Sequence, residues 1–312
     1  MAPAGGRFRH EALLYAGADE FVAHTAGFVR AGLDAEEAVL VAVIEERAQC
    51  LREELGADAS RVEFLAMTEV GRNPARIIPV WQEWLERNSG RGTGLRGIGE
   101  PVWPGRSELE IRECRLYEHL LNTVFAEGSG WRLLCPYDAE RLPQSVLRRV
   151  AGSHPAVRGE PPADSDPFDA RAGLAAFDAP PPELGPPLFE TAFGLEELPL
   201  LRIAIRERAA PLGLYGRRVS DFVLVADELA SNSVRHGGGS GRLALWALDG
   251  HAVCEVRDAG LISDPLAGRR RPRLSLAAGG AGLWTANQLC DLLLIHSTPA
   301  TGTAVRAYLS RR

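Results

Sequence analysis

The sequence contains no lysine: all 35 basic side chains among its 312 residues are arginine, against 41 acidic side chains. A Walker A phosphate loop requires a lysine, so the chain cannot contain a working one. Schiff-base chemistry and a lysine general base are excluded for the same reason. A nucleotide site in this protein must therefore be built from backbone amides, arginine, aspartate, asparagine and a metal ion.

Long apolar runs and paired cysteines are also missing. No stretch approaches the ~18 apolar residues of a membrane span, and MAPAGGRFRH at the start has no apolar segment after its charges. The five cysteines are scattered without a C-x-x-C spacing, which fits reduced thiols better than a disulfide framework or a zinc site. We therefore expect a cytoplasmic protein without a membrane partner.

The charges are distributed unevenly along the chain. Residues 1–150 hold 18 arginines and 23 acids, residues 151–194 hold 2 and 7, and residues 195–312 hold 15 and 11. The sequence has no long basic stripe, which argues against nucleic acid as a direct partner. The mildly basic last third allows a local anion site.

A proline-rich segment divides the sequence. Residues 155–187 contain nine prolines, which fix φ and remove backbone donors. We expect an extended linker there, between one domain at residues 1–154 and another at residues 188–312. The alternative is a proline-rich surface of one larger domain.

Before this segment, continuous apolar stretches alternate with amphipathic ones. Such alternation predicts an α/β domain with a mainly parallel sheet and helices on both faces. The expected strands are residues 11–17, 38–44, 61–67, 94–103 and 131–138, and the expected helices are residues 19–32, 45–55, 74–88, 107–127 and 142–152.

The pattern changes after the linker, where helices and strands no longer alternate. Leu248-Asp249-Gly250 is a hairpin signal between two strand-like runs. Helices combined with an antiparallel or mixed sheet predict an α+β sandwich. The expected helices are residues 198–212, 218–235 and 282–290, and the expected strands are residues 242–248, 251–258, 291–297 and 303–309.

One helix of the C-terminal domain carries a polar column. Glu228, Asn232 and His236 are spaced four apart, so they share a helix face. An amide oxygen suits Mg²⁺, and a carboxylate can accept a hydroxyl proton, so the column fits a Mg²⁺–triphosphate site. A solvated polar face is the alternative interpretation.

Two glycine motifs follow in the sequence. Asp258-Ala-Gly260 ends a strand, where an aspartate can accept a hydrogen bond from a base amine, although D-x-G is also an ordinary turn. Gly279-Gly280-Ala281-Gly282 opens a helix, whose free amides favour phosphate. The loop between them is a candidate lid or a surface loop, and it contains Arg269, Arg270, Arg271 and Arg273.

In this order, the motifs DELASNSVRHG, VCEVRDAG, GGAGLWTANQLCD and GTAVRAYL resemble the histidine-kinase-type ATPase domain with the Bergerat fold. The resemblance covers residues 188–312 and is closest to the anti-sigma-factor serine kinase branch. It implies ATP and Mg²⁺ as cofactors and Glu228 as the catalytic base. The nucleotide-binding residues it implies are Asn232 (which also holds the metal ion), His236, Asp258, Gly260, Arg271, Gly280, Gly282 and Thr303.

Two positions depart from the pattern of this family. Ile262 stands where a second glycine follows D-x-G, and Ala281 stands where relatives often carry a larger polar residue. Either change is expected to weaken ATP turnover more than ATP binding.

The N-terminal domain contains the stretches RHEALLYAG, GIGEPVW, LYEHLLN, LLCPYD and SHPAV, which resemble the MEDS family of sensory domains. The resemblance implies a RecA-like α/β core that senses a small molecule. Candidate ligand residues are His10, Glu100, Glu118, Cys135 and Tyr137. The alternative is structural, with Cys135 as a buried strand thiol and Glu118 as a cap or surface ion pair.

These features together suggest a signalling protein that regulates transcription. The first hypothesis is an ATP–Mg²⁺-binding anti-sigma factor with serine/threonine kinase activity. Its expected partners are an anti-sigma factor antagonist of the STAS type, a sigma factor, or both, and relatives of this branch often form homodimers.

Two alternatives remain open. One is a non-catalytic module in which ATP only orders the lid for partner capture. The other, a sensor histidine kinase, is less favoured, because residues 155–198 offer no helical hairpin with a histidine and His154 is followed by Pro155.

Overall fold

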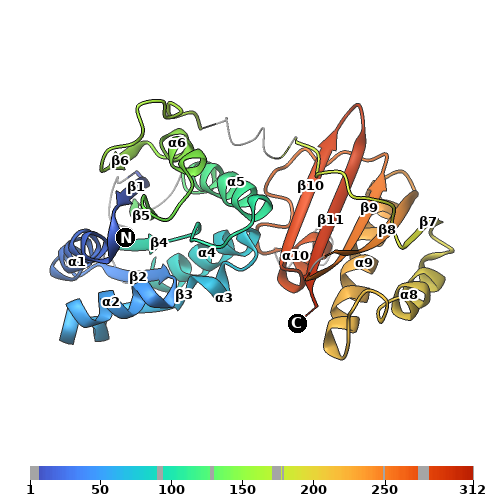
Figure 1. The fold of residues 1–312 in the computed structure, drawn as a ribbon, viewed down its shortest axis with the longest axis horizontal. Helices are drawn as coiled ribbons and strands as arrows, with labels where there is room; N and C mark the ends of the chain where they lie inside the picture. Colours follow the sequence, from blue (N-terminus) through green and yellow to red (C-terminus); the bar gives the residue numbers. More distant parts are fainter. Residues whose placement is uncertain are drawn as a thin grey trace. The chain divides into compact units, whose positions relative to one another are not determined.

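The structure is a computed structural model that describes residues 7–89, 94–126, 130–170, 177, 179–248, 250–272 and 281–311 (Figure 1). The chain divides into two compact units, Met1–Leu174 and Ala175–Arg312. No helix among the described residues is both long and apolar enough to span a membrane.

The first unit contains a six-stranded sheet in the order β3-β2-β4-β5-β1-β6, in which every pair is parallel. This confirms the predicted α/β class. The strands are β1 (Arg9–Tyr15), β2 (Ala38–Val43), β3 (Glu63–Ala66), β4 (Leu95–Gly99), β5 (Trp131–Asp138) and β6 (Ala156–Arg158). The α-helices are α1 (Gly17–Asp34), α2 (Glu45–Leu55), α3 (Met67–Val70), α4 (Ile77–Asn88), α5 (Glu108–Val124) and α6 (Gln144–Ser153).

Helices cover both faces of this sheet. On one face α1 and α2 contribute Phe21, Val29 and Leu51 to a core shared with Val41 of β2. On the other face the indole of Trp81 lies against β4, since a Cβ added to Gly97 or Gly99 would come within 2.8 or 2.9 Å of its ring. Glycine in a strand thus makes room for a large aromatic side chain.

The first helix begins directly after β1. Gly17 has φ +76°, which glycine adopts without strain. The Glu20 carboxylate turns back and accepts a hydrogen bond of 2.7 Å from the amide of Ala16, and Asp19 adds a second acid to the first turn. Acidic side chains at this end match the positive pole of the helix dipole.

In the described part of the second unit, helices α8, α9 and α10 accompany a five-stranded antiparallel sheet in the order β10-β11-β9-β8-β7. The predicted α+β sandwich is confirmed. Helix α9 packs on the sheet, and α8 and α10 contact α9. The elements are β7 (Phe189–Gly194), α8 (Leu198–Glu207), α9 (Arg217–His236), β8 (Ser240–Leu248), β9 (His251–Asp258), α10 (Ala281–Leu289), β10 (Leu292–Thr298) and β11 (Gly302–Ser310).

Both ends of the expected linker make contacts. Residues 156–158 form β6, which pairs with β1. Near the other end, Arg306 donates to the carbonyl of Pro182 at 2.6 Å, and the indole of Trp246 donates to that of Gly185 at 2.7 Å. Proline lacks a backbone donor but keeps its carbonyl, so a proline-rich segment can still be held through its acceptors.

Candidate functional site

A cavity of about 350 Å³ lies in the second unit between α9, the ends of β9 and β11, and the segment that follows β9. Most of the surface that lines it is apolar, and seven residues contribute polar side chains: Asn232, Ser233, His236, Asp258, Ser263, Asp264 and Thr303. The apolar part of the lining includes Leu229, Val256, Gly260, Ile262, Leu283 and Val305. Such a combination of apolar walls and polar groups is typical of small-molecule sites.

Helix α9 and the start of α10 meet beside this cavity. A Cβ on Gly282 would lie 2.7 Å from Glu228 Oε2 and 2.9 Å from Asn232 Nδ2. The structure therefore brings together a carboxylate, an amide and a helix N-terminus that are some fifty residues apart in the sequence. His236 lines the same cavity one turn further along α9 and is exposed.

The carboxylate of Asp258 is held in place from two sides. The hydroxyl of Ser233 donates to Oδ2, and the amide of Gly260 donates to Oδ1 at 2.8 Å. Each carboxylate oxygen can accept more than one hydrogen bond, so Asp258 retains acceptor capacity toward the cavity. A Cβ on Gly260 would lie 2.7 Å from the carbonyl oxygen of His236, so only glycine fits there without a shift of the backbone.

The hydroxyl of Thr303 fixes the loop after Asp258. Thr303 is buried and donates to the carbonyl of Gly260 at 2.9 Å, and its hydroxyl also lies 2.6 Å from that of Ser297. Ser297 in turn accepts a hydrogen bond of 2.8 Å from the amide of Ile262. The unusual Ile262 thus adds apolar surface to the cavity while its backbone is anchored.

The structure describes the expected lid only as far as Pro272, and Arg269 within this part is buried. Gly279, Gly280 and Arg273 belong to the part of the chain that the structure does not describe. Arg271 is exposed and is not among the residues that line the cavity.

Sequence reasoning missed Ser233, which orients Asp258, and the apolar walls. Ser233 follows Asn232 directly, but nothing in the sequence showed that its hydroxyl meets a strand 25 residues later.

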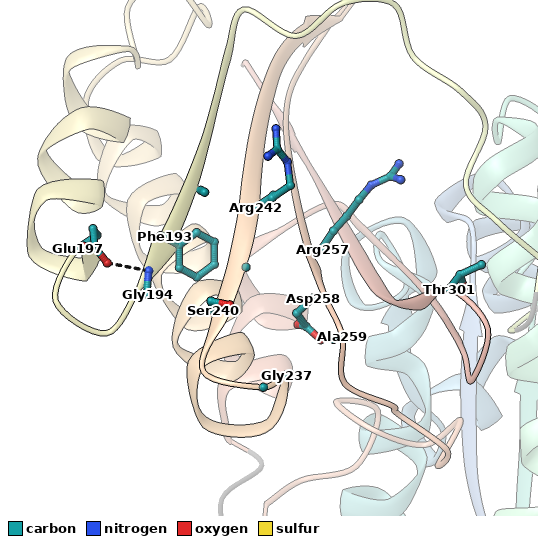
Figure 2. Close-up of a pocket in the computed structure, with 13 residues that line it drawn as sticks. Phe193, Gly194, Glu197, Gly237, Ser240, Arg242, Arg257, Asp258, Ala259 and Thr301 are labelled. Atoms are coloured by element: carbon teal, nitrogen blue, oxygen red, sulfur yellow. Dashed lines mark hydrogen bonds between the residues drawn. The ribbon is translucent and has the colours of Figure 1, made fainter.

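A larger pocket of about 810 Å³ adjoins the end of β7, β8 and β9 (Figure 2). It shares Gly237 and Asp258 with the smaller cavity. Figure 2 shows Arg242 and Arg257 extending from neighbouring strands at its edge. Both arginines already pair with acids, Arg242 with Glu190 at 3.0 Å and Arg257 with Glu255. The smaller cavity offers the apolar slot that a base or other flat ligand needs, so we regard it as the candidate site.

The first unit contains a buried polar cluster. His10, Glu118, Cys135 and Tyr137, all selected from the sequence, lie together with His154. The cluster comes from β1, α5, β5 and the residue after α6, and every member is at most 4% exposed.

Contacts within this cluster centre on the Glu118 carboxylate. Burial lowers the pKa of His10 and raises that of Cys135 well above its usual value. Burial raises the pKa of Glu118, whereas His154 and His10 lower it when their rings are protonated, and in that state the pKa lies well below its usual range.

Glu100, the fifth residue selected from the sequence, lies elsewhere. It follows the carboxyl end of β4, where it accepts hydrogen bonds from the amide of Ile44 at 3.0 Å and the hydroxyl of Tyr15 at 3.3 Å. His154, which sequence reasoning considered only as a phosphoacceptor, is 2% exposed and belongs to the cluster instead.

Replacing Glu100 by glutamine is expected to remove a pH dependence of stability. Glu100 is 1% exposed, and burial raises its pKa from 4.5 to about 7. Because the folded state binds the proton more tightly, the contribution of Glu100 to stability is full below pH 4.5 and is lost as the pH rises to about 7, by roughly 3 kcal/mol in all.

Urea unfolding of the wild type and Glu100→Gln at pH 5 and pH 8 measures this effect. The free energy of unfolding of the variant minus that of the wild type should be larger at pH 8 than at pH 5. The reason is that glutamine keeps an acceptor for the amide of Ile44 but carries no charge at either pH. An equal difference at both pH values would contradict the prediction.

Each of the two units matches a known family of protein domains. Residues 9–155 match the model of the MEthanogen/methylotroph, DcmR Sensory domain, MEDS, and residues 192–309 match the model of the Histidine kinase-like ATPase domain. No curated protein matches the chain. At the level of the two domains, both resemblances drawn from the sequence are confirmed: the N-terminal unit is similar to the MEDS sensory domain, and the C-terminal unit is similar to the histidine kinase-like ATPase domain.

Proposed function

We propose that the protein is an ATP–Mg²⁺-dependent anti-sigma factor with serine/threonine kinase activity, controlled by its N-terminal sensory domain. The observation that carries the proposal is the position of Asp258, whose carboxylate is fixed at an apolar cavity next to the junction of α9 and α10. This arrangement places three features next to one another: a hydrogen-bond acceptor for the base, an apolar cavity for its ring, and a helix junction for the phosphates.

The cavity fits the base of a purine nucleotide. Leu229, Val256 and Val305 contribute apolar surface against which a flat ring packs, and the volume of about 350 Å³ is in the range of ligand pockets. The spare acceptor capacity of Asp258 suits an exocyclic amine, which adenine has at C6 and guanine lacks there. The residues present therefore fit ATP.

The phosphate end is formed by α9 and α10. Asn232 offers an amide oxygen for Mg²⁺, and Gly282 in the first turn of α10 lies so close to it that a Cβ there would be 3.0 Å from this oxygen. Bound ATP would supply the phosphoryl group for transfer. Glu228, whose carboxylate lies against the same turn, is placed to accept the proton of an attacking hydroxyl.

The proposed partners follow from the branch of the family that the motifs resemble. An anti-sigma factor antagonist of the STAS type would present the serine or threonine hydroxyl, and a sigma factor would be the protein held inactive. The N-terminal domain would respond to a small molecule.

Incubation with labelled ATP and Mg²⁺, with and without a panel of antagonist proteins, tests the proposal. Asn232→Ala is expected to lose nucleotide binding and phosphorylation together, because the metal ligand is removed. Glu228→Gln should keep most of the ATP affinity and lower the rate of phosphorylation by roughly 100-fold or more. Glu207→Gln, an exposed carboxylate on α8, is the matched control and should behave as the wild type.

The label also separates the alternatives. Acid-stable label on a partner supports the serine/threonine kinase, whereas acid-labile label on the protein itself would indicate a histidine kinase. If no partner is labelled but nucleotide-dependent partner binding survives in Glu228→Ala, the protein is a non-catalytic partner-switching module. The substitutions at Ile262 and Ala281 give that second candidate its support.

A further inference from the structure

Four side chains of the first unit direct potential metal ligands at one point. The ligand atoms of His10, Glu118, Cys135 and His154 all lie within 4.8 Å of one another, and all four residues are buried. His10 Nε2 lies 2.9 Å from Glu118 Oε2, and His154 Nε2 lies 3.4 Å from the same oxygen. The thiol sulfur of Cys135 is 3.4 Å from His10 Nε2 and 3.7 Å from Glu118 Oε2.

A tetrahedron around a metal ion has six edges, of which these separations give four; the other two, from His154 to His10 and to Cys135, are at most 4.8 Å. With bonds of about 2.0–2.1 Å to nitrogen or oxygen and about 2.3 Å to sulfur, tetrahedral ligands are roughly 3.3–3.6 Å apart. Three of the four measured separations lie in or next to this range. The contact between His10 and Glu118 would lengthen by a few tenths of an ångström.

Surrounding hydrogen bonds set the tautomer of both imidazoles. Asn122 donates through its amide nitrogen to the carbonyls of Ser153 at 2.8 Å and Glu118 at 3.3 Å, so its oxygen faces His10 Nδ1 at 3.1 Å and accepts the proton there. His154 Nδ1 lies 2.8 Å from the carbonyl of Val150 and donates to it. In each neutral ring the lone pair is therefore on Nε2, as in a metal-binding histidine whose other nitrogen is held by an outer partner.

The centre of the cluster is consequently rich in acceptors, and the thiol of Cys135, which points a donor at Glu118 Oε2 from 3.7 Å, is the only donor among these four ligand groups. Two imidazole lone pairs and a carboxylate oxygen face one another, and His154 Nε2 makes no hydrogen bond although it is buried. Tyr137 donates to the other oxygen of Glu118 at 2.9 Å and so fixes which oxygen points inward. A shared proton or a metal ion would satisfy this arrangement, and the added thiol favours the metal ion.

We propose that His10, Glu118, Cys135 and His154 bind a divalent transition-metal ion of the zinc class. Nitrogen, oxygen and sulfur ligands in a closed set of four are typical of a structural zinc site. The scattered cysteines give no sign of this site, because only one of its four ligands is a cysteine. The inference does not depend on the nucleotide site.

Cobalt titration of the full-length protein tests the site. The protein is prepared without a histidine tag, stripped with a chelator and kept free of nucleotide, so that no other cobalt site is introduced. We expect one equivalent of Co²⁺ to produce a thiolate-to-metal charge-transfer band and the intense visible bands of a tetrahedral centre. Added Zn²⁺ should remove both sets of bands, because it displaces cobalt from the same site.

Cys135→Ser should abolish the charge-transfer band and weaken Co²⁺ binding by at least roughly 100-fold, since losing even an outer-shell partner costs about 10- to 100-fold. Cys114→Ser is the matched control: its thiol is equally buried, on α5, and donates to the carbonyl of Pro101 at 3.2 Å, which serine can also do. This control should bind cobalt as the wild type does.

Circular dichroism of each metal-free variant shows whether it folds. If Cys135→Ser does not fold, His154→Gln takes its place and should lose affinity by a similar factor while keeping the weakened charge-transfer band of a cobalt thiolate at high cobalt concentration. The proposal is overturned if the wild type binds no Co²⁺, or if a folded Cys135→Ser variant keeps the charge-transfer band.

Discussion

Replacing Glu255 by alanine is expected to lower the free energy of unfolding of the C-terminal unit by about 3–5 kcal/mol. Glu255 on β9 and Arg306 on β11 are 2% and 1% exposed, and Glu255 Oε2 accepts hydrogen bonds of 2.7 and 2.6 Å from the guanidinium. Removal of the carboxylate leaves a buried cation without its counter-charge, which is much more costly than losing an exposed ion pair.

Glu190→Ala is the matched control for this variant. Glu190 pairs with Arg242 at 3.0 Å on neighbouring strands of the same sheet, but these side chains are 45% and 62% exposed. Its removal should change stability by less than about 1 kcal/mol. Urea unfolding followed by circular dichroism measures both, and equal losses in the two variants would contradict the argument from burial.

Asp258→Asn is expected to weaken ATP binding by roughly 10- to 100-fold, because a hydrogen bond to a charged acceptor is worth about 1.5–3 kcal/mol. Asparagine has nearly the same shape, but one of its two terminal groups is a donor. That group would face either the amide of Gly260 or the hydroxyl of Ser233, both of which donate to Asp258. The variant therefore loses both the charge and the fixed orientation.

Calorimetric titration with ATP and with GTP measures this effect. The wild type should prefer ATP, and the preference should shrink in Asp258→Asn. Asp264→Asn provides the control. Asp264 also lines the cavity, but it is exposed, and the one described hydrogen bond of its carboxylate comes from the nearby amide of Leu266. Unchanged ATP affinity in Asp258→Asn would exclude the proposed base recognition.

The alternation of strands and helices in the N-terminal unit was predictable, because a strand of a covered parallel sheet is apolar throughout. Ala38–Val43 is the clearest case, with five of its six residues buried. Strand β7 was missed for the opposite reason. It begins two residues after Pro187, and only one of its six residues is buried, so it has no apolar run.

The sites were predictable in part. A spacing of four residues places Glu228 and Asn232 on one face of a helix, but their contact with Gly282 depends on how two helices pack. In the other unit, His10 is the second residue of β1, whereas Glu100 follows the carboxyl end of β4. In a parallel sheet the amino ends of the strands lie along one side and the carboxyl ends along the other. This explains why Glu100 is separate from the cluster around His10.

The start of α1 has an electrostatic consequence. In α/β folds the helix after the first strand is a common place for phosphate, because its free amides and dipole attract an anion. Here the carboxylate of Glu20 already accepts the hydrogen bond of the Ala16 amide, and Asp19 is a second acid in the same helical turn. An incoming phosphate would have to displace one internal anion and approach another, without any lysine to offset the repulsion. In the first unit, the Glu20 carboxylate thus competes with any phosphate for the N-terminus of α1.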